Sequence, residues 1–297
     1  MSKILILHQQ YRDYTFTFKN LSQTTLKTQR YVVEQFVRRT KLTSLEEISR
    51  PLIEHYIMKS KIEKGWSAKT IKNTLNTLRL FLDWCVSMDF IESNPASKIP
   101  SPKLPKRLPK SLSKEESLRL LEWARVARFD YKFERFRALA ILAVLLYTGI
   151  RKQELLNLKL SDVEFQKRTL FVECGKGQKD RVIPLNYKLI QILQDYLNER
   201  TRLSKNTAYF FSTLRGNGKM SPMAVKRIFE RIKKESGVYA YPHLMRHTFA
   251  TLMLEGGCDL FTLSKLMGHG DVKTTTIYLS TSVKHSMEQI HKHPLSF

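Results

Sequence analysis

Five prolines in residues 95–114 limit how this chain can fold. A proline inside a helix removes a backbone donor and clashes with the preceding turn, so no helix can run through these residues. The same residues are rich in lysine and arginine, and an extended linker accommodates both features. We therefore expect an N-terminal domain in residues 1–94, a linker in residues 95–114 and a C-terminal domain in residues 115–297. Each domain is long enough to bury its own core.

Positive charge is spread over both expected domains. The chain has 51 lysine and arginine residues against 27 acidic ones, which gives a formal net charge of +24. Up to residue 110 there are 20 basic and 9 acidic residues, which leaves 31 basic and 18 acidic residues after it. A basic tail would carry its charge at one end, so this distribution indicates that both domains touch one polyanion. Apolar residues at helical spacing favour a folded nucleic-acid-binding protein over a ribosomal or membrane-surface protein.

The chain shows no sign of export or of membrane insertion. Cys85, Cys174 and Cys258 are isolated, so they predict neither a disulfide framework nor a cysteine zinc site. The apolar run at the N-terminus is too short for a signal peptide, and the longest apolar stretch, residues 138–146, is too short to span a bilayer. We expect a cytoplasmic protein that associates with the nucleoid when it binds DNA, with no membrane partner.

Helical spacing of apolar residues dominates both domains. In the N-terminal domain we expect helices after the caps Ser22 and Ser67, and another that begins at Ser44 or Leu45 and runs towards Met58. In the C-terminal domain we expect helices at residues 115–128, 132–148, 187–199, 222–235, 243–254, 260–267, 272–279 and 283–291. Residues 168–174 and 180–185 predict two strands around a glycine-rich turn. The fold class is mainly α with a small antiparallel β-sheet.

Two groups of side chains are candidate DNA contacts. On the helix after Ser67 one polar stripe has an asparagine between two cations, which suits base reading in a major groove: Lys72, Asn76 and Arg79. A solvated helix face explains this stripe equally well. In the linker, three cations are expected along a phosphate backbone, although plain solvation explains each of them as well: Lys103, Lys106 and Arg107.

Cationic side chains at two glycine-bounded positions can act on a phosphate. Arg151 follows Gly149, which ends an apolar helix, and Glu154 is placed to fix its guanidinium by an ion pair. A purely structural pair is the alternative. Lys176 lies at the tip of the predicted hairpin, where it can reach into a groove and protonate a leaving oxygen. Lys179 and Arg181 are the alternatives for that role, or plain phosphate contacts.

The last part of the chain adds two histidines, an arginine and a tyrosine. His243 and Arg246 project from one side of a helix that Pro242 can start, and His269 lies between two glycines ahead of Tyr278. A zinc site at His243 and His247 is disfavoured, because Leu244 stands where a zinc protease needs its glutamate. Metal-free attack on a phosphodiester requires this collection of groups: Arg151, Lys176, His243, Arg246, His269 and Tyr278.

In this order, the motifs closely resemble those of the tyrosine recombinase family, also called the lambda-integrase family. The similar segments are Thr-Gly-Ile-Arg at residues 148–151 with Glu-Leu at 154–155, Gly-Lys-Gly at 175–177, His-Leu-Met-Arg-His at 243–247, Leu-Met-Gly-His at 266–269 and Thr-Thr-Ile-Tyr at 275–278. The resemblance runs from about residue 15 to the C-terminus. It implies a SAM-like core-binding domain followed by a catalytic domain, and it assigns those six residues to catalysis.

The resemblance also implies a reaction. Tyr278 would attack a DNA phosphate and form a 3′-phosphotyrosyl link, Arg151 and Arg246 would stabilise the charge, and His243 would assist the tyrosine proton. Lys176 would protonate the 5′ oxygen and His269 would donate to the phosphate. The reaction needs no cofactor, metal or ATP. Four subunits would assemble on two duplexes at a specific recombination site, with or without a partner recombinase.

Length and domain order resemble the Xer branch of the family, which resolves chromosome or plasmid dimers. Lys152 and Gln153 depart from the Xer pattern, so an integrase-excisionase of a mobile element is the alternative role. A type IB topoisomerase shares the chemistry, and a non-catalytic DNA-binding protein could keep the fold. The separate helical domain favours strand exchange between duplexes over a topoisomerase. The complete set of six residues argues against a non-catalytic protein.

Overall fold

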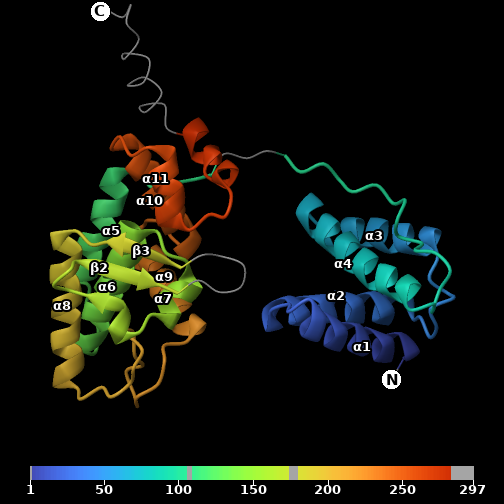
Figure 1. Ribbon diagram of the computed structural model, residues 1–297, viewed down its shortest axis with the longest axis horizontal. Coiled ribbons are helices and arrows are strands. Elements are labelled where there is room, and N and C mark those ends of the chain that lie inside the picture. Colours follow the sequence, from blue (N-terminus) through green and yellow to red (C-terminus); the bar gives the residue numbers. More distant parts are fainter. Residues whose placement is uncertain (1, 106–108, 174–179, 282–297) are drawn as a thin grey trace, which may run out of the picture. The chain divides into compact units, whose positions relative to one another are not determined.

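A computed structural model describes residues 2–105, 109–173 and 180–281 of the chain. Lys106, Arg107, Lys176, Lys179 and the helix expected at residues 283–291 lie outside these residues. The chain divides into two compact units, residues 1–106 and 107–297 (Figure 1). No helix in the described ranges is long and apolar enough to cross a membrane.

Helices pack around one apolar core in the first unit. They are α1 (Lys3–Phe18), α2 (Gln23–Thr40), α3 (Arg50–Lys64) and α4 (Ala68–Ser87). The expected caps form, because Ser22 accepts a hydrogen bond from Thr25 N and Ser67 accepts one from Thr70 N. Such caps satisfy backbone donors that the first helical turn leaves without partners.

Two predictions for this unit were wrong or incomplete. The helix α3 begins at Arg50 behind the cap Ser49, because Pro51 fits only the first turn of a helix. The side chain of Glu47 closes a turn before it by accepting hydrogen bonds from Thr43 N and Ser44 N. The helix α1 was not predicted, since its buried side includes His8 and Thr15 and therefore lacks a continuous apolar pattern.

The proline-rich segment is attached to both units by its ends. Arg79 on α4 donates to the carbonyls of Ala96 and Ile99 and, at 2.9 Å, to the hydroxyl of Ser101. Leu112 is buried in the second unit, where its backbone N–H donates to the Thr248 hydroxyl at 2.9 Å. The described residues of 101–105 and 109–113 contain no helix or strand, in keeping with their prolines.

The second unit is built around α6 (Lys132–Thr148), where every residue from 138 to 145 is at most 8% exposed. Around it lie α5 (Lys114–Val126), α8 (Tyr187–Arg202) and α10 (Pro242–Glu255) (Figure 1). The remaining helices of the described residues are α7 (Lys152–Asn157), α9 (Pro222–Ser236) and α11 (Leu260–Met267). An all-round apolar helix of this kind must be the centre of its unit.

A small antiparallel sheet covers one side of this unit. Its described strands β1 (Val163–Glu164), β2 (Thr169–Val172) and β3 (Arg181–Pro184) lie in the order β1-β2-β3, with Leu170 opposite Ile183. The β2–β3 pair confirms the predicted hairpin, and β1 was not predicted. Leu170 and Ile183 are buried, so alternation along the strands directs one side of the sheet to the core.

The predicted helix at residues 272–279 is wrong in type. The structure has two 3₁₀ segments instead, η2 (Val272–Thr274) and η3 (Thr276–Thr281). The side chain of Asp271 accepts a hydrogen bond from Lys273 N, which favours a tight turn over an α-helical start. The break between the segments lies at Thr275, which is fully buried.

Candidate active site

The first arginine is positioned by the end of α6. Gly149 ends that helix with φ 61°, and a side chain there would collide with the ring of Phe249. Arg151 then becomes the N-cap of α7, and Glu154 accepts hydrogen bonds from its backbone N–H at 2.7 Å and from Nη1 at 2.8 Å. This confirms the predicted pair. The side chain of Arg151 remains 31% exposed, so it can still reach a ligand.

Glu154 holds a second guanidinium from the sheet. Arg181 on β3 donates to both oxygens of Glu154, at 3.2 and 2.8 Å, and to the carbonyl of Leu266 at 2.7 Å. Burial alone would raise the pKa of Glu154. Hydrogen bonds from Arg181 and Arg151 outweigh burial and hold this pKa below its ordinary value. Arg181 was predicted to contact DNA. Its side chain is only 7% exposed and forms an ion pair with Glu154 inside the protein.

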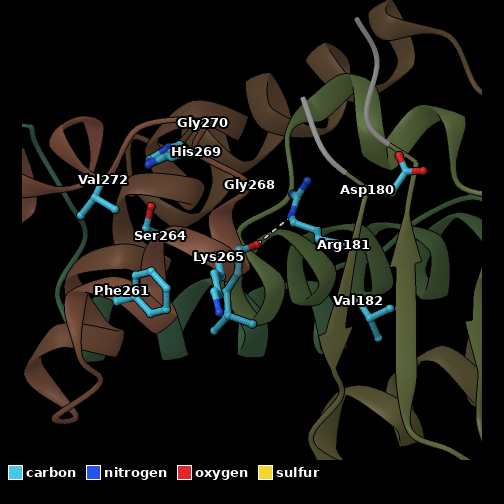
Figure 2. A pocket seen from close by; sticks show the side chains of 11 residues that line it. Asp180, Arg181, Val182, Phe261, Ser264, Lys265, Gly268, His269, Gly270 and Val272 are labelled. Carbon is cyan, nitrogen blue, oxygen red and sulfur yellow. Dashed lines mark hydrogen bonds between the residues drawn. The ribbon is translucent and has the colours of Figure 1, made fainter. Parts of the chain in front are cut away.

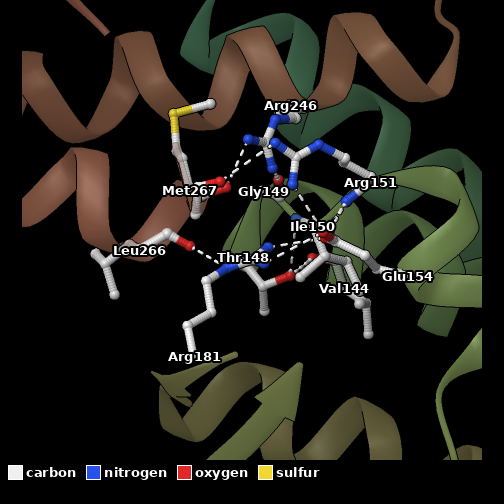
Figure 3. Close-up of polar contacts among 11 residues, drawn as sticks. Val144, Thr148, Gly149, Ile150, Arg151, Glu154, Arg181, Arg246, Leu266 and Met267 are labelled. Atoms are coloured by element: carbon white, nitrogen blue, oxygen red, sulfur yellow. Dashed lines mark hydrogen bonds and ion pairs between the residues drawn. The ribbon is translucent and has the colours of Figure 1, made fainter. Parts of the chain in front are cut away.

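The second arginine is buried and fixed by two carbonyls. Arg246 on α10 donates to the carbonyl oxygens of Gly149 and Met267, both at 2.6 Å. In Figure 3 the guanidiniums of Arg151 and Arg246 extend from different helices into the same space. Burial and then the charge of Arg151 lower the pKa of Arg246 to about 10, so it is still a cation at neutral pH.

His269 is held by the 3₁₀ region. Gly268 ends α11 with φ 64°, and the next residue, His269, lies with its Nδ1 2.7 Å from the hydroxyl of Thr275. Burial, with Arg246 and Arg151 as further causes, lowers the pKa of His269 to about 4. The ring is therefore neutral at neutral pH and keeps one N–H to donate.

Tyr278 is packed against the same elements. It is 2% exposed and lies in a small apolar cluster with residues of α10 and α11. Burial raises its pKa, while the charges of Arg246 and Arg151 oppose that rise. The positive charges of both arginines therefore favour the ionised form of this tyrosine.

The histidine that touches this tyrosine, His247, was not predicted as a site residue from the sequence. Nδ1 of His247 lies 2.8 Å from the Tyr278 hydroxyl oxygen, whereas the predicted His243 is exposed and meets the ring of His247 at 4.7 Å between centroids. The sequence does carry one signal, because His243 and His247 are four residues apart and hence neighbours on one helical face. That spacing suggested only a zinc site.

The candidate DNA contacts of the first unit and linker differ in availability. Asn76 and Lys103 are exposed and Lys72 is partly exposed, whereas Arg79 donates hydrogen bonds to the carbonyls of residues 96 and 99.

Within the described parts of the chain, no three His, Cys, Asp or Glu side chains gather as a metal site would need.

An open pocket adjoins the segment that carries His269. It has a volume of about 640 Å³ and lies between β3 and the segment from α11 to η2, as Figure 2 shows. Arg181, Lys265 and His269 are among the residues that line it. Lys176, at the tip of the hairpin predicted between residues 168–174 and 180–185, lies outside the described residues.

Known proteins share both units. Residues 110–285 match the phage integrase family, and residues 7–92 match the N-terminal SAM-like domain of phage integrases. The crystal structure of the XerH site-specific recombinase bound to palindromic difH substrate, a post-cleavage complex, has the same fold. It is 22% identical, with a TM-score of 0.74 over 92% of this chain and 81% of that one. The fold is therefore that of a SAM-like domain followed in the chain by an integrase catalytic domain.

Two relatives are similar in sequence over most of their length. The tyrosine recombinase XerC of Thermodesulfovibrio yellowstonii is 34% identical over 94% of this chain and 93% of the relative. The tyrosine recombinase XerA of Pyrococcus furiosus is 35% identical over 77% of this chain and 76% of the relative. The chain belongs to the phage integrase family of tyrosine recombinases.

Proposed function

We propose that this protein is a site-specific recombinase that cuts and rejoins double-stranded DNA through a 3′-phosphotyrosyl link to Tyr278. The observation that carries the proposal is that the tyrosine and both arginines gather around the end of α11. Tyr278 of η3 packs against residues of α10 and α11, and Arg151 and Arg246 both donate to carbonyls at the end of α11, those of Gly268 and Met267. The nucleophile and both guanidiniums come from a single chain.

In the proposed reaction Arg151 and Arg246 bind the non-bridging oxygens of the scissile phosphate. Their guanidiniums are already oriented by Glu154 and by backbone carbonyls, so little reorganisation is needed as charge develops. Each such donor contributes about 3 kcal/mol to transition-state stabilisation. His269 donates a further hydrogen bond to the phosphate, and His243 contacts it from the exposed start of α10.

The energy of the broken phosphodiester is kept in the phosphotyrosine, so the proposed reaction needs neither ATP nor a metal ion. Lys176 protonates the 5′ oxygen that leaves. The 5′ hydroxyl of a partner duplex then reverses the step. We place the reaction in a tetramer on two duplexes in the cytoplasm, with or without a partner recombinase. The length and domain order favour the role expected of the Xer branch, resolution of chromosome or plasmid dimers, and the likeness to XerC along 94% of the chain agrees with that branch.

The test is the formation of a covalent protein–DNA complex. The substrate is a nicked duplex that carries the sequence which the protein selects from a pool of random duplexes. The wild-type protein should become covalently attached to the 3′ end at the cut, while Tyr278→Phe should bind the duplex with nearly unchanged affinity and form no adduct. An adduct on the phenylalanine variant would mean that another residue is the nucleophile.

A further inference from the structure

Each histidine of the centre has a different neighbour. The Nδ1 atom of His247 lies 2.8 Å from the Tyr278 hydroxyl oxygen, and the two rings are 5.5 Å apart between centroids. His269 instead directs its Nδ1 to the hydroxyl of Thr275, and His243 stands exposed beside the ring of His247. The position of His247 next to the reacting oxygen calls for a chemical role.

We propose that His247 is the proton acceptor for Tyr278 in the cleavage step and returns that proton when the strand is rejoined. The proposal rests on the proposed function, because it assigns a group to the same reaction. Its geometry is already that of a proton transfer, since an oxygen–nitrogen separation of 2.8 Å is an ordinary hydrogen bond.

The step balances without any further reactant. The O–H bond of Tyr278 breaks, its proton moves to Nδ1 of His247, and the tyrosine oxygen bonds to phosphorus as the bond from phosphorus to the 5′ oxygen breaks. The departing 5′ oxygen takes its proton from a separate acid, which is Lys176 in the proposed function. In rejoining, the imidazolium of His247 protonates the departing tyrosine. The proposal requires the neutral tautomer that carries its proton on Nε2.

The electrostatic surroundings keep His247 ready to accept. Burial lowers its pKa to about 4, with His243 and Arg246 as further causes, so its ring is neutral at neutral pH. The groups that face it are His243 and Arg246 from α10, Tyr278 from η3 and His269 from the loop after α11. A phosphodiester anion bound at Arg246 would offset that cation. The basicity of His247 would then rise when DNA is in place.

The discriminating experiment compares two leaving groups. On the nicked duplex, His247→Asn keeps a polar group near the Nδ1 position but cannot take up a proton at neutral pH. We expect it to slow formation of the covalent complex at least about 100-fold, the usual range for loss of a general base, with DNA affinity within about twofold of wild type. The defect should persist when sulfur replaces the bridging 5′ oxygen, because a thiolate leaves without being protonated. A Lys176→Ala defect should largely disappear on that substrate.

The pH profile separates chemistry from structure. Without a base the tyrosine must ionise by itself, so the rate of His247→Asn should rise about tenfold per pH unit below the pKa of Tyr278. His243→Asn, one turn earlier on the same helix, loses a phosphate contact, so it should lower the rate but keep the shape of the wild-type pH profile. Rates of His247→Asn within about threefold of wild type, or its rescue by the sulfur substrate, would overturn the inference. A wild-type protein that forms no adduct on any duplex would instead overturn the proposed function.

A measurement on the free protein covers the case in which the variant does not fold. In the full chain labelled with ¹⁵N-histidine, we expect His247 to be protonated on Nε2 and unprotonated on Nδ1 at neutral pH. Tyr278→Phe should shift the Nδ1 resonance, since it removes the hydrogen bond. A proton on Nδ1 of His247 in the wild-type protein would contradict the proposal.

Discussion

Hydrogen bonds decide where each charged or titratable side chain of the centre points. Glu154 fixes Arg151, backbone carbonyls fix Arg246, and Tyr278 is held by His247. His269 depends on a hydroxyl, because the oxygen of Thr275 lies 2.7 Å from its Nδ1. A preorganised group of this kind needs no reorientation when the phosphate arrives, which is where such centres gain most of their rate.

Removing the hydroxyl of Thr275 should therefore slow the reaction without weakening DNA binding. Thr275→Val keeps the branched shape but leaves His269 without its partner, and the loss of one such hydrogen bond corresponds to a rate decrease of roughly tenfold. The rate of covalent-complex formation on the nicked duplex measures it. Thr275→Ser retains the hydroxyl and should stay close to wild type. A slow Thr275→Ser together with a normal Thr275→Val would show that the methyl group and not the hydroxyl matters.

At the scale of elements, helix ends position most of the centre. Gly149 and Gly268 end α6 and α11 in the left-handed region, and the residues that follow turn Arg151 and His269 into the site. These helices could be predicted from the sequence because capping and apolar spacing are local signals. The 3₁₀ region could not be predicted, since it depends on a hydrogen bond to the Asp271 side chain. The helix α1 could not be predicted either, since it buries the polar residue His8.

The same distinction applies to the candidate site. The pair of Arg151 and Glu154 is three residues apart and was predicted correctly, because neighbours on a helix can be read from spacing. The contact of Arg181 with Glu154 joins residues 27 positions apart, and that of His247 with Tyr278 joins residues 31 apart. Such pairs are set by how α7, β3, α10 and η3 pack, which local patterns do not specify.

Two glycines in the same conformation allow the packing at the end of α6 to be tested. Gly65 and Gly149 both end helices with φ near 60°, but a side chain at Gly65 meets nothing within 4 Å, whereas one at Gly149 collides with Phe249. Gly65→Ala should cost about 1 kcal/mol from backbone strain alone. Gly149→Ala should cost about 3 kcal/mol, since overpacking adds to the strain. Hydrogen exchange measures the free energy of unfolding of each unit. An equal loss of unfolding free energy in the two variants would contradict the role of Phe249.

The first unit contains a buried histidine that should make it sensitive to acid. His8 is 2% exposed and packs edge-on against Phe81, and burial, with Arg12 and Arg30 as further causes, lowers its pKa to about 4. The unfolded chain, with a pKa near 6.5, takes up the proton first. Stability that is present above pH 6.5 is therefore lost as the pH falls towards 4, and the shift corresponds to about 3 kcal/mol.

His8→Phe should remove this contribution, because phenylalanine does not titrate and fits an aromatic cluster. Hydrogen exchange of α1 and α4, measured from pH 7 to pH 4, gives the free energy of opening for this unit. The difference between wild type and His8→Phe should change with pH over that window. A constant difference would show that the pKa of His8 is the same in the folded and the unfolded chain.

At the scale of the whole molecule, charge determines how the protein would hold DNA. The net charge of +24 is shared by both units, so phosphate contacts from both should release many counterions on binding. Affinity for any duplex should then fall steeply with salt. Sequence preference must come from the few polar side chains that can reach base edges.

Lys72 and Asn76 on α4 provide the last prediction, because they separate these two contributions. They lie one turn apart, Asn76 is exposed, and the third member of the predicted stripe, Arg79, is committed to the proline-rich segment. Lys72→Ala should weaken binding to every duplex and reduce the slope of log affinity against log salt by about 1. Asn76→Ala should relax the preference for one base by about 1–3 kcal/mol and leave the salt slope unchanged. Selection from random duplexes at two salt concentrations measures both effects, and an unaltered base preference in Asn76→Ala would mean that α4 presents only a solvated face.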